Sequence, residues 1–354
     1  MSTYQPPFQV TESMIARVAE IAAQAERIRI LGSPEDALLH RRNRIQSIHS
    51  SLAIEQNTLS EEQVTAVLRG ERVLAPPKDI LEVQNAFEAY EKLEELDPYS
   101  SSDLLTAHGI MMGSLIPEAG RFRTGNVGVV RGQDVLHIGT LPPNIAGAVE
   151  QLLDWVKTSD YPMLIKSSIF HYEFELIHPF ADGNGRMGRL WQTLLLSRWQ
   201  PVFAWLPVES MIYRHQEEYY AAINRSNDMG EGTAFLEFML SMILTTAQEA
   251  SAVSRELPSA LQKYWARIAP HLTPDTRLRN AKVQEWCSVS PATANRILNQ
   301  LCAASLLDRH GAGKARRQGE GLTKTVQSRL TTKPARHSAM AAECRFLWWK
   351  DLRI

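Results

Sequence analysis

Apolar residues recur at helical spacing along most of the chain as far as Ala250, and this pattern predicts a mainly α-helical protein. In the first such segment Met14, Val18 and Ile21 share one face, and Thr11 is a candidate N-cap. Ser60 and Gln63 have the spacing of a capping box. The predicted helices are Thr11–Ile30, Ala37–Ile54, Ser60–Leu68, Lys78–Leu96, Asp103–Met112, Ala146–Thr158, Pro162–Ile177, Asn184–Arg198, Val208–Asn224 and Thr233–Ala250.

One stretch, Gly120–Gly139, breaks the helical pattern with several glycines and valines. Two alternating runs, Asn126–Val130 and Asp134–Ile138, flank Arg131-Gly132-Gln133. Alternation on both sides of a short polar turn predicts a β-hairpin. The predicted fold is therefore a helical bundle with a single hairpin.

The region 251–317 resembles a separate small domain. Two short predicted helices, Lys282–Cys287 and Ser290–Ala303, follow a helical segment at Ser259–Ile268 and are joined by a tight turn. A Gly-rich basic stretch follows, so the order is that of a winged helix-turn-helix, with DNA or a protein as its partner. A plain helical hairpin is the alternative. The predicted divisions are 1–100, an N-terminal helical region; 101–250, a core; 251–317; and 318–354, a basic tail without helical periodicity.

Composition places the chain among globular proteins: 44% of its 354 residues are hydrophobic and 22% are charged. The net charge of −1 is uninformative, but Lys and Arg gather after Arg309, as in a solvated basic tail or a nucleic-acid contact. The three cysteines lack CxxC spacing, and their odd number argues against a disulfide framework, which fits a reducing cytoplasm. We see no secretory signal and no apolar run of the ~18 residues that a membrane span needs, so no membrane partner is expected.

The candidate chemistry lies in one segment, His178-Pro-Phe-Ala-Asp182-Gly-Asn-Gly-Arg186-Met-Gly-Arg189. A glycine-bearing loop that leads into a helix presents unpaired N–H groups and a positive dipole end, which suits phosphate. Arg186 and Arg189 share a helical face, Asp182 is a hard oxygen ligand for Mg²⁺, and His178 titrates near neutrality. Gly-Asn-Gly alone would be an ordinary turn, but the surrounding residues favour a nucleotide site.

This segment matches every fixed position of the Fic family signature, HxFx(D/E)GNGRxxR, and the resemblance extends from Tyr4 to Ala250. Membership implies a helical fold with a small β-hairpin. It implies a protein adenylyltransferase, which moves AMP from ATP to a Ser, Thr or Tyr hydroxyl of a target protein. The implied base is His178, and Asp182 is the implied Mg²⁺ ligand. The implied ATP-binding residues are Asp182, Gly183, Asn184, Gly185, Arg186, Met187, Gly188 and Arg189, and Phe180 is implied to anchor the loop.

Ser51 and Glu55, four residues apart near the end of a predicted helix, resemble the family's inhibitory motif (S/T)xxxE(G/N). The resemblance implies that Glu55 forms a bidentate pair with Arg189 and occupies the place of the ATP γ-phosphate. Gln56 departs from the preferred Gly or Asn. Without the downstream signature, Glu55 would be interpreted as a solvated residue at a helix end. In some family members the corresponding glutamate assists the removal of AMP.

Two further assignments follow from the resemblance. The hairpin, through Val127, Gly128, Val129 and Val130, is implied to be a flap that pairs with the target backbone, although it could simply cap the core. Tyr219, Tyr220 and Asn227 resemble the adenosine-contacting stretch. Adjacent residues on a helix face different ways, so we expect one tyrosine to contact adenine and the other to pack.

Three functions stay open on sequence alone. They are AMP transfer inhibited by Glu55, a related Fic transferase that uses another donor or an enzyme that removes AMP, and a nucleotide-sensing DNA-binding regulator. An intact His178 argues against a pure sensor. A homodimer is expected from similar proteins.

Overall fold

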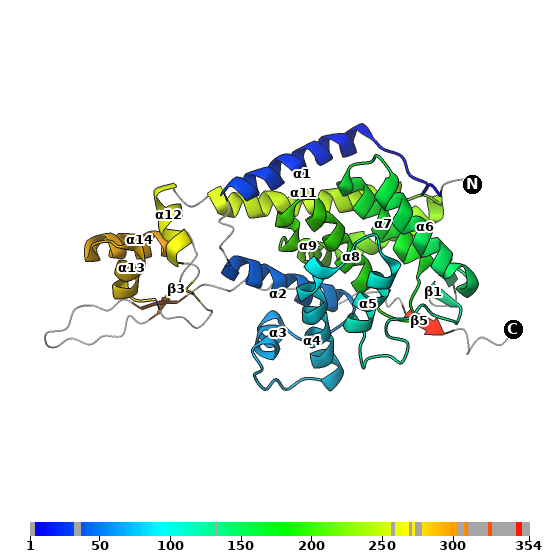
Figure 1. The fold of residues 1–354 in the computed structure, drawn as a ribbon, viewed down its shortest axis with the longest axis horizontal. Coiled ribbons are helices and arrows are strands. Elements are labelled where there is room, and N and C mark those ends of the chain that lie inside the picture. Colours follow the sequence, from blue (N-terminus) through cyan, green and yellow to red (C-terminus); the bar gives the residue numbers. More distant parts are fainter. Residues whose placement is uncertain are drawn as a thin grey trace. The chain divides into compact units, whose positions relative to one another are not determined.

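The computed structural model describes residues 4–31, 37–131, 134–255, 259–268, 271–272, 278–303, 308–310, 325–327 and 345–348 (Figure 1). Helices dominate these residues. In chain order the elements are α1 (Glu12–Leu31), α2 (Ala37–Ile54), α3 (Glu61–Leu68), α4 (Pro77–Glu91), η1 (Leu93–Glu95), α5 (Ser101–Met111), β1 (Val127–Arg131), β2 (Asp134–Ile138), η2 (Pro142–Asn144), α6 (Ile145–Thr158), α7 (Met163–Ile177), α8 (Asn184–Trp199), η3 (Pro201–Ala204), α9 (Val208–Arg214), α10 (Gln216–Met229), α11 (Thr233–Arg255), α12 (Ser259–Ile268), α13 (Asn280–Cys287), α14 (Pro291–Ala303), β3 (Asp308–His310), β4 (Thr325–Gln327) and β5 (Arg345–Trp348).

The chain divides into two compact units. The first comprises Met1–Ala25, Asn43–Gln248 and Ala341–Ile354, and the second comprises Glu26–Arg42 and Glu249–Met340. The described helices include none long and apolar enough to cross a membrane.

The first unit is built around α7 and α8, which pack along each other and are buried over most of their length. Both helices are buried on nearly every side, polar residues such as Ser167 and Gln192 included, which is the position of a central helix. Phe170, Phe174, Leu190 and Leu194 lie in this core with no exposed surface. The remaining helices of the unit cover this pair.

The long helices α1 and α11 run side by side (Figure 1). Arg17 donates to the backbone oxygen of Glu237, and Gln248 donates to Glu20. These contacts join the N-terminal helix to the last helix of the first unit, although the two are far apart in sequence.

A buried carboxylate ties four helices together. Glu209 on α9 accepts hydrogen bonds from Ser47 on α2, Tyr90 on α4 and Thr193 on α8, each at 2.8 Å. A buried carboxylate needs such donors because it has lost its water. The network fixes α2 against the body of the unit, and α2 carries Glu55 at its end.

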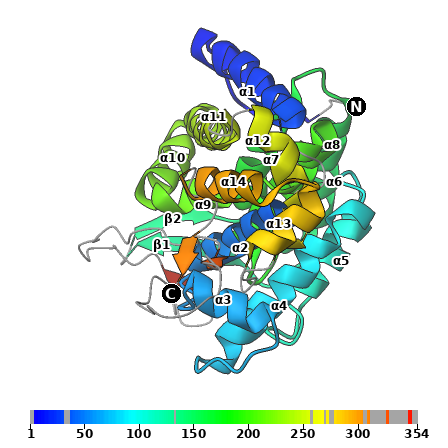
Figure 2. The same cartoon turned by 90° about the vertical axis from the view of Figure 1, so that its left-hand side faces the viewer.

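Strands β1 and β2 pair antiparallel, with Gly128 opposite Ile138 and Arg131 opposite Asp134 (Figure 2). A register shift between Val129 and Val130 marks a bulge. On its other edge β1 pairs antiparallel with β5. The structure thus places Arg345–Trp348, part of the predicted basic tail, in a sheet, whereas most of 318–354 lies outside the described residues.

Two predicted helices are interrupted in the structure. The prediction Val208–Asn224 was wrong, because His215 leaves helical geometry (φ −117°, ψ 37°) and separates α9 from α10. After this break the Gln216 side chain donates to the backbone oxygen of Ile54. The spacing of apolar residues cannot predict such a tertiary contact. The predicted Lys78–Leu96 ends as an α-helix at Glu91, with the 3₁₀ turn η1 after it.

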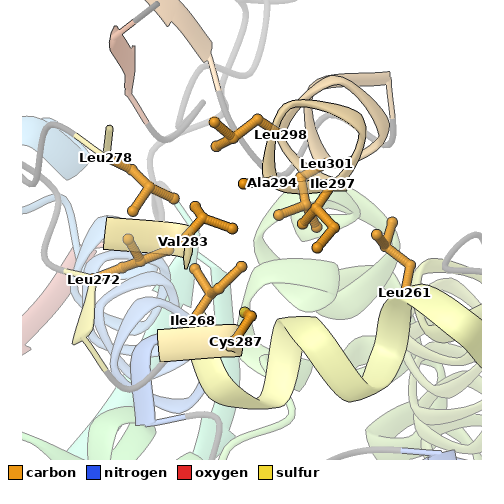
Figure 3. Packing of buried hydrophobic residues seen from close by; sticks show 10 residues of the cluster. All are labelled: Leu261, Ile268, Leu272, Leu278, Val283, Cys287, Ala294, Ile297, Leu298 and Leu301. Atoms are coloured by element: carbon orange, nitrogen blue, oxygen red, sulfur yellow. The ribbon is translucent and has the colours of Figure 1, made fainter. Parts of the chain in front are cut away.

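The second unit contains α12, α13 and α14, whose apolar side chains converge in a small core (Figure 3). Helices α13 and α14 are joined by a short turn in which Ser288 is left-handed (φ 53°). Strands β3 and β4 pair antiparallel after α14. The core consists of Leu261, Ile268, Leu272, Leu278, Val283, Cys287, Ala294, Ile297, Leu298 and Leu301.

Helix α2 ends in a tight, fully hydrogen-bonded cap. Gln56 is left-handed (φ 68°), its N–H donates to Ala53 O, and the Asn57 N–H donates to Leu52 O, each at 3.0 Å. These two bonds define a Schellman motif, in which the left-handed position is usually glycine. The capping-box prediction for Ser60 and Gln63 at the start of α3 is confirmed.

We predict that Gln56→Gly stabilises the first unit. The left-handed conformation costs an L-residue ~1–2 kcal/mol, of which the larger unfolded-state entropy of glycine cancels ~0.5–1 kcal/mol. The net gain should raise the thermal midpoint by roughly 2 °C. The control is Gln46→Gly inside the same helix, which should lower the midpoint. A fall for both variants would contradict the cap argument.

Candidate functional site

His178 lies at the turn that leaves α7. Its backbone is left-handed (φ 50°, ψ 61°), and its N–H donates to Phe174 O. A non-glycine residue in this region is uncommon and needs support from its surroundings. That support comes from Arg123, whose Nε donates to His178 O at 2.6 Å and whose backbone N–H donates to Pro179 O at 3.0 Å.

Arg123 also holds the segments on either side of the hairpin. Its guanidinium donates to Gly125 O at 2.7 Å and to Thr140 O at 2.6 Å. One buried guanidinium therefore connects the base of the hairpin to the backbone of His178. Our sequence analysis missed this residue, for which the only signal was an arginine within a glycine-rich stretch.

The loop after His178 is held by its own side chains. The Asn184 amide accepts from Phe180 N–H and donates to Phe180 O, each at 2.9 Å, so this side chain is a loop clamp. The predicted anchor Phe180 is fully buried and stacks on His108, with ring centroids 3.6 Å apart. Gly183 is left-handed (φ 88°), and a Cβ there would strike Met112.

His108, which the sequence did not single out, links the loop to Gly120 through its two ring nitrogens. Its Nδ1 accepts from Gly120 N–H, so Nε2 carries the proton and donates to Asp182 O at 3.0 Å. Burial lowers the pKa of His108 to about 4, which keeps the ring neutral and this tautomer fixed.

Helix α8 begins directly after this loop, with Gly183 as its N-cap and no side-chain cap. The first amides of the helix, at Asn184, Gly185 and Arg186, have no intrahelical acceptor. Together with the positive dipole end they form a site for an anion. Met187 is buried and contributes to the core rather than to this surface.

Arg186 lies between two carboxylates. Its Nη2 is 2.9 Å from Asp182 Oδ1, and its Nη1 is 3.1 Å from Glu82 Oε1 on α4. Glu82 also accepts from the Asn57 amide at 2.8 Å. The Asp182 side chain is 49% exposed, whereas that of Glu82 is only 7% exposed. Glu82 was not predicted, because nothing in its helix distinguishes it from a solvated glutamate.

Arg189, with 1% of its side chain exposed, meets the end of α2. Its Nη2 lies 2.7 Å from Glu55 Oε1 and 3.0 Å from Ser51 O, and its Nε lies 3.0 Å from Ser51 Oγ. The expected bidentate Arg189–Glu55 pair is therefore not formed, because Ser51 takes two of the donations. Gly185 is essential to this contact, since a Cβ there would collide with the Glu55 carboxylate.

Gly188 brings α7 and α8 into close contact. A Cβ at this position would lie 2.9 Å from the His171 ring and 3.3 Å from Glu175 Oε1. His171 donates from Nδ1 to Gln192 Oε1 at 2.7 Å and accepts at Nε2 from Tyr219 OH, 3.1 Å away. Burial lowers the pKa of His171 to about 3, so it acts as a neutral structural link.

The three predicted adenosine-contacting residues occupy different environments. Tyr219 is buried against His171, whereas Tyr220 is 36% exposed and interacts electrostatically with Glu55 and Arg189. Asn227 accepts from Tyr172 OH at 3.1 Å.

The four predicted flap residues all lie on β1: Val127, Gly128, Val129 and Val130. The side chains that follow Val127 on this strand lie outside the part of the chain that the structure describes.

Fold and site together define a mainly helical protein in which a glycine-bearing loop joins two central helices, and Glu55 at the end of a neighbouring helix pairs with Arg189. The family model described as the Fic/DOC family matches residues 95–196. A solved Fic family protein from Desulfovibrio desulfuricans G20 is 38% identical, with a TM-score of 0.68, over 94% of this chain and 100% of that one. The chain belongs to the Fic family.

Curated relatives match over a shorter range. The protein adenylyltransferase fic-1 of Caenorhabditis elegans is 32% identical over 207 residues, 54% of this chain and 38% of that protein. The protein adenylyltransferase Fic of Nematostella vectensis is 28% identical over 206 residues, 55% of this chain and 45% of that protein. The chain thus spans about two fifths of the length of these relatives. A solved C. elegans Fic-1 fragment, 22% identical with a TM-score of 0.55, shares the fold over 69% of this chain and 74% of that one.

We predict that the two carboxylates on Arg186 differ in their effect on stability. Glu82→Ala removes the buried partner and should lower the free energy of unfolding by ~2–3 kcal/mol. Asp182→Ala removes a half-exposed partner and should cost less than ~1 kcal/mol. Urea denaturation of both variants measures the difference, and equal losses would show that Glu82 does not support the guanidinium.

Proposed function

We propose that this protein transfers AMP from ATP to a hydroxyl of a target protein, and that Glu55 inhibits the reaction. The observation that carries the proposal is the placement of His178, the first turn of α8 and the Arg189–Glu55 contact around one loop. Curated relatives named protein adenylyltransferases, matched over more than half of this chain, support the same activity.

In the proposed reaction His178 is the general base. Its Nδ1 lies 3.3 Å from Glu175 O, and a carbonyl acceptor requires that Nδ1 carry the proton of the neutral ring. Nε2 then keeps its lone pair and takes the proton from the target hydroxyl. The hydroxyl oxygen attacks the α-phosphorus of ATP in line, the bond to the β-phosphate oxygen breaks, and pyrophosphate leaves.

The phosphates would lie on the amides of Gly183, Asn184 and Gly185, with Arg186 and Arg189 at their outer oxygens. Asp182 would hold Mg²⁺ together with the nucleotide, and the ion would neutralise phosphate charge. A single half-exposed carboxylate fits an ion that is bound largely through phosphates. The described residues contain no cluster of three or more His, Cys, Asp or Glu side chains for a closed metal site.

Inhibition would follow from competition for Arg189. Its guanidinium is buried and already paired with Glu55, so a γ-phosphate that seeks the same donors must displace that carboxylate. The Schellman cap and the Gln216–Ile54 bond hold the end of α2 in place. We expect this competition to keep ATP in an unproductive pose.

The remaining assignments concern the substrates. We propose that an extended target segment pairs with β1, since that strand accepts β5 on its edge away from β2. Tyr220 is our candidate for adenine stacking, because it is exposed whereas Tyr219 is buried. We place the reaction in a reducing cytoplasm, as the cysteine spacing predicts.

We predict that α-labelled ATP transfers its label to protein and that Glu55→Gly increases the rate by about 10- to 100-fold, since a charged hydrogen bond contributes ~1.5–3 kcal/mol. Adding His178→Ala should reduce the rate by about 10²- to 10⁴-fold. The measurement counts labelled protein, including self-modification, with Mg²⁺ and with either α- or γ-labelled ATP.

Gln56→Gly is the matched control, because it introduces glycine beside Glu55 and retains the carboxylate. It should leave the rate low, and EDTA should abolish transfer in every variant. Transfer of γ-label would indicate phosphate transfer instead. No labelled protein in any variant, even with a cell lysate as the target source, would contradict the transferase proposal.

We further propose that the second unit binds DNA through α14. The helix pair α13–α14 with its tight turn has helix-turn-helix order, and β3–β4 follows as a candidate wing. The exposed face of α14 presents Asn295, Arg296, Asn299 and Gln300, and the helix has no acidic residue. These side-chain types read base edges in the major groove.

We predict that the wild-type protein enriches a sequence motif from a random duplex library, and that Arg296→Ala weakens or alters that motif. Lys263→Ala, an exposed cation on α12, is the control and should retain it. Binding should weaken as salt increases. Absence of enrichment, or equal effects of the two substitutions, would assign α14 a role other than base reading.

A further inference from the structure

Glu175 is a buried carboxyl group one helical turn before His178. Only 14% of its side chain is exposed, and its Oε1 has no hydrogen-bond partner among the described residues. Leaving a buried polar group unsatisfied costs ~1–3 kcal/mol, so a glutamate in this position requires an explanation. Packing alone would be better served by an apolar residue.

The carboxyl group faces the proposed base. Glu175 Oε2 lies 3.8 Å from His178 Nδ1, the nitrogen that also faces the Glu175 backbone oxygen. Glu175 Oε1 lies against Gly188, where the absence of a side chain leaves space for the carboxyl group. The backbone oxygen and the carboxyl Oε2 of Glu175 therefore both lie close to the same ring nitrogen, at 3.3 and 3.8 Å.

The surrounding charges come from three other helices. Glu55 on α2 and Arg189 on α8 act on Glu175 with opposite signs, and Tyr219 and Tyr220 on α10 face it as neutral phenols. Burial first and the Glu55 carboxylate second raise the pKa of Glu175 to about 8, against the lowering effect of Arg189. At neutral pH the group is mostly protonated while Glu55 is in place, and it ionises as pH rises through about 8.

We propose that Glu175 is a positioning residue for His178. Glu175 holds the His178 ring with Nδ1 protonated and Nε2 towards the target hydroxyl. When ionised, its carboxylate stabilises the imidazolium that forms during transfer. This inference rests on the proposed function. No proton moves to or from Glu175 in the reaction, since the proton accepted by Nε2 stays on His178 until it is released to solvent. An anion beside Nδ1–H favours the charged ring by simple Coulombic attraction.

The first test needs no turnover. In the full-length wild-type protein with ¹⁵N-labelled histidine, the His178 ring resonances should show the Nδ1–H tautomer and a second inflection near pH 8, where Glu175 ionises. Glu175→Gln keeps the shape and removes the ionisable carboxyl, so the second inflection should vanish.

The matched control is Glu173→Gln. Glu173 is a buried carboxyl on the same helix, but it accepts from Tyr4 OH and faces away from His178. It should leave the titration of His178 unchanged. The same His178 titration in all three proteins, or an Nε2–H tautomer in the wild type, would overturn the proposal. If Glu175→Gln does not fold, the inflection near pH 8 in the wild type decides alone.

The second test measures transfer in the Glu55→Gly background. The rate of α-label incorporation at saturating ATP should rise with pH as Glu175 ionises, whereas the double variant with Glu175→Gln should be on the order of 10- to 100-fold slower at pH 9. The difference between the two should narrow towards acid pH, where the Glu175 carboxyl is protonated, with the KM for ATP unchanged. A uniform loss at every pH would indicate a merely structural role. No transfer in Glu55→Gly itself would count against the proposed function and leave the titration result standing.

Discussion

The whole site depends on a chain segment that must cross the interior between α7 and α8. Buried backbone groups need hydrogen-bond partners, and the irregular turn from His178 to Asn184 cannot supply them from a helix. Arg123, Asn184 and His108 provide them, at His178 O, at both polar groups of Phe180 and at Asp182 O. Because these contacts are buried, His178, the proposed base, and the first amides of α8 are held in place by the fold itself.

The second constraint is the charge on Arg189. A guanidinium this deep must have acceptors, and they come from Glu55 and Ser51. In the proposed reaction, ATP and Glu55 are therefore alternative partners of one cation. Glu175 belongs to the same electrostatic group, because the carboxylate that pairs with Arg189 also raises the pKa of Glu175. In the proposed mechanism, inhibition by Glu55 and the charge beside His178 are thereby linked through a few charged groups at the end of α2, on α7 and on α8.

Two polar networks carry this arrangement into the fold. Glu209 joins α2 to α4 and α8, and Glu82 joins Asn57 at the end of α2 to Arg186. The segment that holds Glu55 is therefore tied to both arginines of the loop, directly at Arg189 and through Glu82 at Arg186. A displacement of that segment by nucleotide would disturb both.

The sequence alone determined the helical class, the ends of most helices and the loop from His178 to Arg189, because these features depend on residues close together along the chain. It also singled out Glu55, through a short motif. It did not determine the break at His215, the roles of Arg123, His108 and Glu82, or the sharing of Arg189 between Glu55 and Ser51. Those depend on which buried groups meet across the fold, and a buried charge or backbone oxygen takes whichever partner the packing brings within reach.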